Sequence, residues 1–214
     1  MTERLEAMLR PLDPVSFSTA TEALTGRKVL AFDPDNPDEV GFLANLKAAA
    51  GGAASRARSE GIVAGRPNEA GNAIEPVVID ALKKHGFAAG TPRCRSGRMR
   101  SAGYPDIRVY DGHRTAYIDC KTYSKRTKDQ TLRTFYLSPS SDPKITDDAF
   151  HFLMSFELEQ TDSGVFLPVR WGIYELARLN LHLKFEFNAS NRNLYTKDSL
   201  LASGAFQSAD SVGP

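Results

Sequence analysis

The sequence has few cysteines and no long apolar run. Only Cys94 and Cys120 occur among its 214 residues, too few for the disulfide framework of a small secreted domain. The four histidines show no spacing typical of a zinc site. No apolar stretch reaches the length of a membrane span, and the first residues contain early acids without a signal-like apolar segment. We therefore expect a cytoplasmic protein that makes no membrane contact.

The chain as a whole has no excess of charge of one sign, but one segment is strongly basic. The chain has 27 Lys and Arg against 26 Asp and Glu, a net charge of +1. Residues 91–134 hold eleven basic and four acidic residues, a net charge of +7, which leaves −6 for the rest. Such a segment suits the binding of phosphates, although a solvated surface would have the same charges.

The composition is that of an ordinary globular protein, with 41% hydrophobic and 25% charged residues. A chain of this length can bury one core, so we expect a single domain over 1–214. Within it we expect a mainly helical N-terminal arm at 1–65, a core at 69–190 and a tail at about 204–214.

Hydrophobic periodicity and turn residues predict the order of the elements. A helix over 36–50 is expected from Asn36 as N-cap, Pro37 at the first position and Glu39 in a capping box. Residues 51–67 are compatible with a weak helix or a loop. Further elements are a helix over 73–85 that ends before Gly86, strands over 105–110, 115–123, 150–158 and 165–174, a short helix over 174–179 and a strand over 181–187. This order predicts an α/β fold with a mixed central sheet flanked by helices.

Three charged residues converge on the expected hairpin over 105–123. Asp106 begins its first strand, and Asp119 and Lys121 lie on its second strand. Residues i and i+2 of a strand point to the same face, so Asp119 and Lys121 project together while Ile118 and Cys120 face the core. Two neighbouring carboxylates repel each other unless a cation lies between them, and Mg²⁺ binds carboxylate oxygens together with water. An adjacent lysine can orient such a water for attack on a phosphodiester.

Glu75, on the helix before the hairpin, is a candidate third carboxylate. The spacing Asn72-x-x-Glu75 also fits a capping box, so a cap and a metal-site role are both open. Glu69 is the alternative acid if the helix starts earlier.

These residues resemble the motif of the PD-(D/E)XK nucleases, in Tyr104-Pro105-Asp106 and then Asp119-Cys120-Lys121, with Glu75 on a preceding acidic helix. The layout is most similar to that of a type II restriction endonuclease, and the resemblance covers about residues 69–160. It implies a restriction-endonuclease-like catalytic core and Mg²⁺-dependent, sequence-specific cleavage of double-stranded DNA that leaves a 5′-phosphate. Asp106, Asp119, Glu75 and the Cys120 carbonyl would bind the metal, and Lys121 would position the attacking water.

A second Asp-x-Lys sequence, Asp142-Pro143-Lys144, competes for the same motif. Proline cannot donate a hydrogen bond in a central strand, so this copy is excluded.

The basic segment supplies the expected DNA contacts. Seven residues are candidates for phosphate binding: Arg93, Arg95, Arg98, Arg100, Lys125, Arg126 and Lys128. The resemblance also implies a homodimer, because a palindromic site mirrors a two-fold axis. Two alternatives stay open: a repair or junction-resolving nuclease of the same fold, and a non-catalytic DNA-binding module.

Overall fold

The computed structural model describes residues 14–65, 67–125 and 135–183, with the single positions 190, 192, 198, 201 and 202. The helices and strands below all lie in one compact unit, Asp13–His182. Among the described residues, no helix combines the length and the apolar character needed to cross a membrane. The expected boundaries of arm, core and tail stay predictions.

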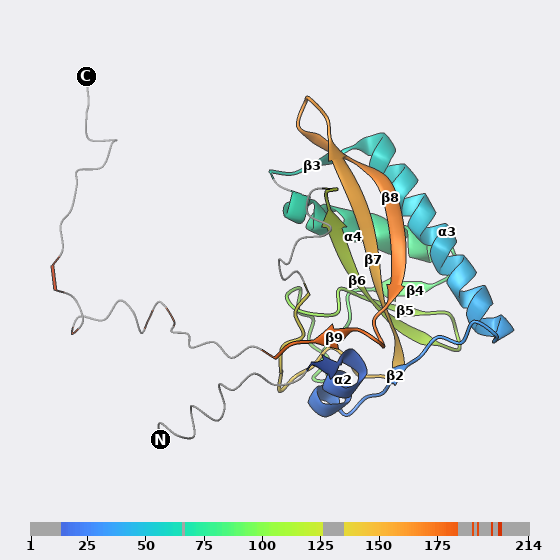
Figure 1. Ribbon diagram of the computed structural model, residues 1–214, viewed down its shortest axis with the longest axis vertical. Helices are drawn as coiled ribbons and strands as arrows, with labels where there is room; N and C mark the ends of the chain where they lie inside the picture. The colour runs from blue at the N-terminus through green and yellow to red at the C-terminus, as the bar shows by residue number, and fades with distance from the viewer. Residues whose placement is uncertain are drawn as a thin grey trace. The chain divides into compact units, whose positions relative to one another are not determined.

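A seven-stranded sheet forms the centre of this unit (Figure 1). Its order is β3 (Ile62–Val63), β8 (Val165–Glu175), β7 (Ala149–Gln160), β6 (Thr115–Tyr123), β5 (Ile107–Tyr110) and β4 (Ala88–Gly90), and β2 (Val29–Leu30) also pairs with β7. β7 runs parallel to β6 and β2, and the other pairs are antiparallel. β1 (Val15–Ser16) and β9 (Asn180–Leu181) form a separate antiparallel pair. This mixed sheet confirms the α/β fold class.

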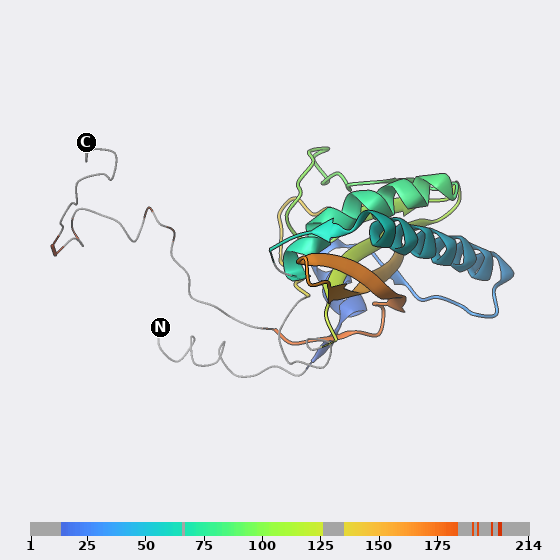
Figure 2. The same ribbon diagram turned by 90° about the horizontal axis from the view of Figure 1, so that it is seen from above.

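Within the described ranges, three helices accompany the sheet: α2 (Phe17–Thr25), α3 (Pro37–Glu60) and α4 (Pro67–Lys84). Figure 2 shows α3 and α4 side by side over one face of the sheet. Leu46 of α3 and Ile74 of α4 share one buried cluster with Ile118 of β6 and Phe156 of β7. Burial of this apolar surface fixes α4 beside β6, the strand that carries Asp119 and Lys121.

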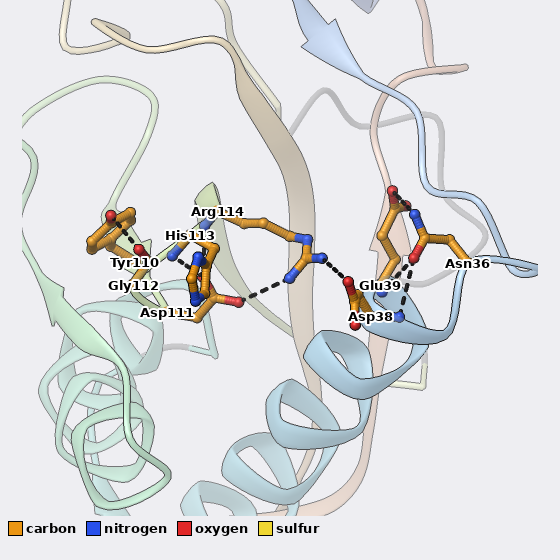
Figure 3. A network of polar contacts seen from close by, with 8 residues as sticks. All are labelled: Asn36, Asp38, Glu39, Tyr110, Asp111, Gly112, His113 and Arg114. Atoms are coloured by element: carbon orange, nitrogen blue, oxygen red, sulfur yellow. Dashed lines mark hydrogen bonds and ion pairs between the residues drawn. The ribbon is translucent and has the colours of Figure 1, made fainter.

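The expected β5–β6 hairpin is confirmed, and its turn is tied to the start of α3 (Figure 3). One carboxylate oxygen of Asp111 accepts the backbone N–H groups of His113 (2.8 Å) and Arg114 (2.6 Å). Gly112 supplies the positive φ of 102° that the turn requires. The Arg114 guanidinium contacts Asp111 at 3.4 Å and Asp38 of α3 at 3.2 Å, so one side chain connects hairpin and helix.

Helix α3 begins where expected and continues ten residues beyond the expected end at residue 50. The Asn36 side chain accepts the N–H groups of Asp38 and Glu39, which confirms the N-cap (Figure 3). The stretch after residue 50, for which the sequence left helix or loop open, is helical, and its residues Ala53 and Ala57 are buried in the core. A Cβ on Gly51 would lie 3.8 Å from the Trp171 indole, and the helix ends only at Gly61, where φ is 72°.

Helix α4 starts at Pro67, so the expected start at residue 73 is wrong. Pro76 lies inside this helix and has no N–H for the carbonyl of Asn72. Asn72 is exposed, so solvent reaches the turn that lacks this hydrogen bond. The expected stop is confirmed, since Gly86 has a φ of 86° and donates its N–H to the Lys83 carbonyl.

The expected helix over 174–179 is wrong. Strand β8 continues to Glu175, and the N–H of Leu176 donates to the His151 carbonyl at 2.9 Å. A turn follows, in which Leu179 donates to the Leu176 carbonyl before β9 begins. Cross-strand hydrogen bonds therefore outweigh the helical propensity of this short stretch. Of the expected strand over 181–187, residues 184–187 lie outside the described residues.

Candidate active site

Asp106 lies at the point where the pairing of β5 with β6 ends. Its backbone N–H donates to the Ile118 carbonyl at 3.1 Å, and its Oδ2 accepts the backbone N–H of Cys120 at 2.8 Å. The carboxylate thus takes the place of the next backbone acceptor in the ladder. This bond fixes the Asp106 side chain beside the strand that bears Asp119 and Lys121.

Asp119 and Lys121 face the same side of β6, as the two-residue spacing predicts. The Lys121 ammonium lies 2.9 Å from Oδ2 of Asp119. The Asp119 side chain is only 4% exposed, against 34% for Lys121. Apart from this ion pair, Oδ2 has no hydrogen-bond partner among the described residues. A buried carboxylate oxygen with so few partners is costly unless a second cation completes it.

Glu75 meets these residues from α4. A pocket of about 420 Å³ is lined by residues of α4, the segment before β5, strand β6 and Tyr136, including Glu75, Asp106, Cys120, Lys121 and Thr122. Because α4 begins at Pro67, Glu75 lies in the helix interior, and the capping box with Asn72 is wrong. Glu69 lies in the first turn of α4 and does not line this pocket.

Burial and mutual repulsion disturb the protonation of the carboxylates. Burial raises the pKa of Glu75 to about 7, and Asp106 and Asp119 add to the rise while Lys121 and Lys144 oppose it. Burial likewise raises the pKa of Asp119 to about 6, although Lys121 acts in the other direction. Burial alone would lower the pKa of Lys121, but Asp119 and Asp106 hold it above its ordinary value. Burial is thus the main cause of both raised carboxyl pKa values, and repulsion from Asp106 adds to each.

The Cys120 side chain lies on the apolar face of β6, between Asp119 and Lys121 in the sequence. Its thiol belongs to the apolar cluster beneath α3 and α4, as expected, and burial raises its pKa well above the ordinary value. The thiol is thus kept protonated. The main-chain N–H of Cys120 takes part in the site through the hydrogen bond that Asp106 accepts.

The expected DNA-binding residues have different surroundings. Three arginines bind within the protein: Arg93 donates to the Gly97 carbonyl, Arg95 to the Thr25 carbonyl, and Arg98 pairs with Asp142 at 3.3 Å. Arg100 and Lys125 are exposed. Arg126 and Lys128 lie outside the described residues.

The sequence did not indicate Lys144, which belongs to the excluded Asp-x-Lys copy. It is 5% exposed, and its ammonium donates to the carbonyls of Ser101 (3.2 Å), Gly103 (2.6 Å) and Pro105 (3.0 Å). These acceptors are about forty positions away along the chain. No local pattern reveals a contact of that range.

Similarity to known proteins identifies the family. The model of the type II restriction enzyme MjaV family matches residues 12–198. The chain belongs to this family. The type II restriction enzyme MjaV of Methanocaldococcus jannaschii is 35% identical to the chain, in an alignment 217 residues long that covers 92% of each of the two chains. No solved structure matches the chain. Type II restriction enzymes cut double-stranded DNA at specific sequences and generally use divalent metal ions, in agreement with the PD-(D/E)XK resemblance.

Proposed function

We propose that this restriction enzyme hydrolyses a phosphodiester of double-stranded DNA, with Mg²⁺, in the pocket between α4 and the β5–β6 hairpin. The observation that carries the proposal is the meeting of Glu75, Asp106 and Lys121 in one pocket, with Asp119 paired to Lys121. Family membership favours this function over repair, junction resolution or binding without catalysis.

The donor set fits a hard divalent cation. Oδ2 of Asp119 is buried with the Lys121 ammonium as its partner, and burial, with added repulsion from Asp106, raises the pKa values of Glu75 and Asp119. The described residues contain no group of three or more His, Cys, Asp or Glu arranged to hold a metal. Mg²⁺ does not require one, because it binds through one or two carboxylates and keeps several waters. Asp106 and Asp119 would hold the ion, with the Cys120 carbonyl and Glu75 as further ligands.

When bound, Mg²⁺ would lower the pKa of a water and offset charge on the phosphate. Lys121 orients the attacking water through its ammonium, which Asp119 keeps in place. The water oxygen forms a bond to phosphorus, and the bond from phosphorus to the 3′-oxygen breaks. The water loses a proton and the leaving 3′-oxygen gains one, which yields a 3′-hydroxyl and a 5′-phosphate. Glu75, with a pKa of about 7, can accept or release a proton near neutral pH.

Basic residues beside the pocket would bind the DNA backbone. Lys125 directly follows β6 and is exposed, and Arg100 precedes the segment that leads to Asp106. We extend the proposal to Arg93, Arg95, Arg98, Arg126 and Lys128, which the basic segment supplies. A homodimer would match a palindromic target, and two buried free thiols suit the reducing cytoplasm.

Digestion of a phage DNA tests this function. With Mg²⁺ we expect discrete fragments with 5′-phosphate ends, and no cleavage with a chelator or with Ca²⁺ in place of Mg²⁺. A smear of fragments would indicate a nuclease without a fixed target. Intact DNA under every metal condition would favour a non-catalytic module and contradict the proposal.

A further inference from the structure

Lys144 is a buried cation outside the carboxylate pocket, and its three hydrogen bonds all go to one short segment. The acceptors are the carbonyls of Ser101, Gly103 and Pro105, at alternate positions of the chain. Ser101 and Gly103 line the candidate active site, and Pro105 is followed directly by Asp106. One ammonium therefore holds the segment that forms one wall of the pocket and ends at a proposed metal ligand.

The segment that carries Lys144 is itself anchored on two sides. The N–H of Arg95 donates to the Pro143 carbonyl at 3.0 Å, and Asp142 accepts the N–H and hydroxyl of Ser96. On the other side Ile145 is buried in a cluster with Tyr117. The backbone of Lys144 is thus held in place, and its ammonium can restrain segment 101–105.

Two further hydrogen bonds connect the end of segment 101–105 to strand β6. The N–H of Asp106 donates to Ile118, and its carboxylate accepts the N–H of Cys120. Lysine donates three hydrogen bonds in a flexible geometry, and all three find acceptors here. Loss of the ammonium would leave three carbonyls without this donor and free the chain just before Asp106.

We propose that Lys144 is a positioning residue that holds segment 101–105 and thereby fixes the Asp106 carboxylate for metal binding. The inference rests on the proposed metal site, and it assigns to Lys144 no contact with substrate. Partners that orient a metal ligand typically change metal affinity by about 10–100-fold when removed.

The test uses Lys144→Met, which keeps an unbranched side chain of similar length and removes the three N–H donors. Lys47→Met, on the exposed face of α3, is the control. Binding of Mn²⁺ alone is measured by calorimetry without DNA. We expect Lys144→Met to weaken this binding by about 10–100-fold and Lys47→Met to leave it unchanged. Amide hydrogen exchange gives a second readout, in which the amides of Asp106 and Cys120 should lose protection while those of β7 keep theirs.

A double-mutant cycle with Asp106→Asn shows whether Lys144 acts through Asp106. In the Asp106→Asn background, Lys144→Met should change Mn²⁺ affinity by less than about twofold. Unchanged affinity and amide protection in Lys144→Met, or full additivity in the cycle, would overturn the inference. If Asp106→Asn alone left Mn²⁺ affinity intact, the proposed metal site would fail instead. If Lys144→Met does not fold, Lys144→Arg is compared with Lys47→Met in its place. Amide hydrogen exchange at Asp106 and Cys120 is then the deciding measurement.

Discussion

The Lys121 ammonium lies 2.9 Å from the buried Oδ2 of Asp119. In the protein without metal, this lysine is the cation that offsets the Asp119 charge. We propose two functions for this pair that substitutions can separate: Asp119 would supply an oxygen ligand to the metal, whereas Lys121 would supply positive charge to the attacking water and the phosphate.

Lys121→Met separates these functions. Cleavage should fall by about 10²- to 10³-fold, the usual cost of removing one well-placed electrostatic partner of a transition state. Mn²⁺ binding without DNA should be unchanged or tighter, because the metal no longer competes with an ammonium for Asp119. Single-turnover kinetics and calorimetry measure the two effects. Loss of metal binding together with cleavage would show that Lys121 builds the metal site rather than serving the water.

Glu75→Gln tests the third carboxylate. Glu75 lies inside α4, and burial disfavours its charged form, so the neutral isostere should not lower thermal stability. Most cleavage activity should be lost if Glu75 binds metal or moves a proton. Glu69→Gln, in the first turn of the same helix, is the matched control and should cleave normally. Full activity in Glu75→Gln would remove this residue from the site.

The basic residues that follow β6 in the sequence should contribute mainly through contacts with phosphates. With Ca²⁺ to block cleavage, alanine at Lys125, Arg126 and Lys128 should weaken binding to every DNA sequence. Each lost phosphate contact lowers the slope of log K against log salt by about 0.9, so the slope should become shallower by about two to three units per subunit. Preference for the target should change little. An unchanged slope would place these residues off the DNA, and a loss of preference alone would mean that they contact bases.

Stability should depend on pH through His151. Its Nδ1 shares a hydrogen bond of 2.6 Å with the Tyr104 hydroxyl, its Nε2 has no partner among the described residues, and burial lowers its pKa from 6.5 to about 3. The unfolded chain thus binds one more proton than the native protein between pH 3 and 6.5. The stabilisation is complete above pH 6.5 and declines as the pH falls towards 3, by at most about 1.4 kcal/mol per unit.

His151→Gln should remove this contribution to the pH dependence. Urea unfolding between pH 4 and 6.5 should give a shallower slope of stability against pH than in the unchanged protein. His85→Gln, at an exposed position after α4, serves as control and should keep the slope. Equal slopes in all three proteins would show that His151 takes up protons freely in the folded state.

The sequence predicted what depends on neighbours in the chain. Alternation and the Asp111-Gly112 turn predicted the hairpin, and the two-residue spacing placed Asp119 and Lys121 on one face. The extension of α3 buries Ala53 and Ala57 in a core shared with residues far along the chain, such as Phe166. Helix α4 starts six residues before the expected position 73, and its only interior proline, Pro76, does not end it.

The burial of the site could not be predicted from the sequence either. Asp119 is almost inaccessible because β6 lies between β5 and β7 in the sheet, a consequence of topology rather than of pattern. The bonds of Lys144 are equally non-local, and the proline that excluded its motif from a strand is compatible with its place in a loop. Contacts between distant segments thus account for most of what the sequence did not indicate.

Asp119→Asn tests the central claim most directly, because the substitution keeps size and shape while it removes the charge. Single-turnover cleavage of a DNA with one target site is measured with Mg²⁺, and Asp162→Asn, in the exposed β7–β8 turn, is the control. Loss of several kcal/mol of charge stabilisation should slow cleavage by about a thousandfold or more. DNA binding with Ca²⁺ should persist, since removal of a negative charge does not weaken attraction to phosphate. An Asp119→Asn enzyme that cuts at the unchanged rate would contradict the account.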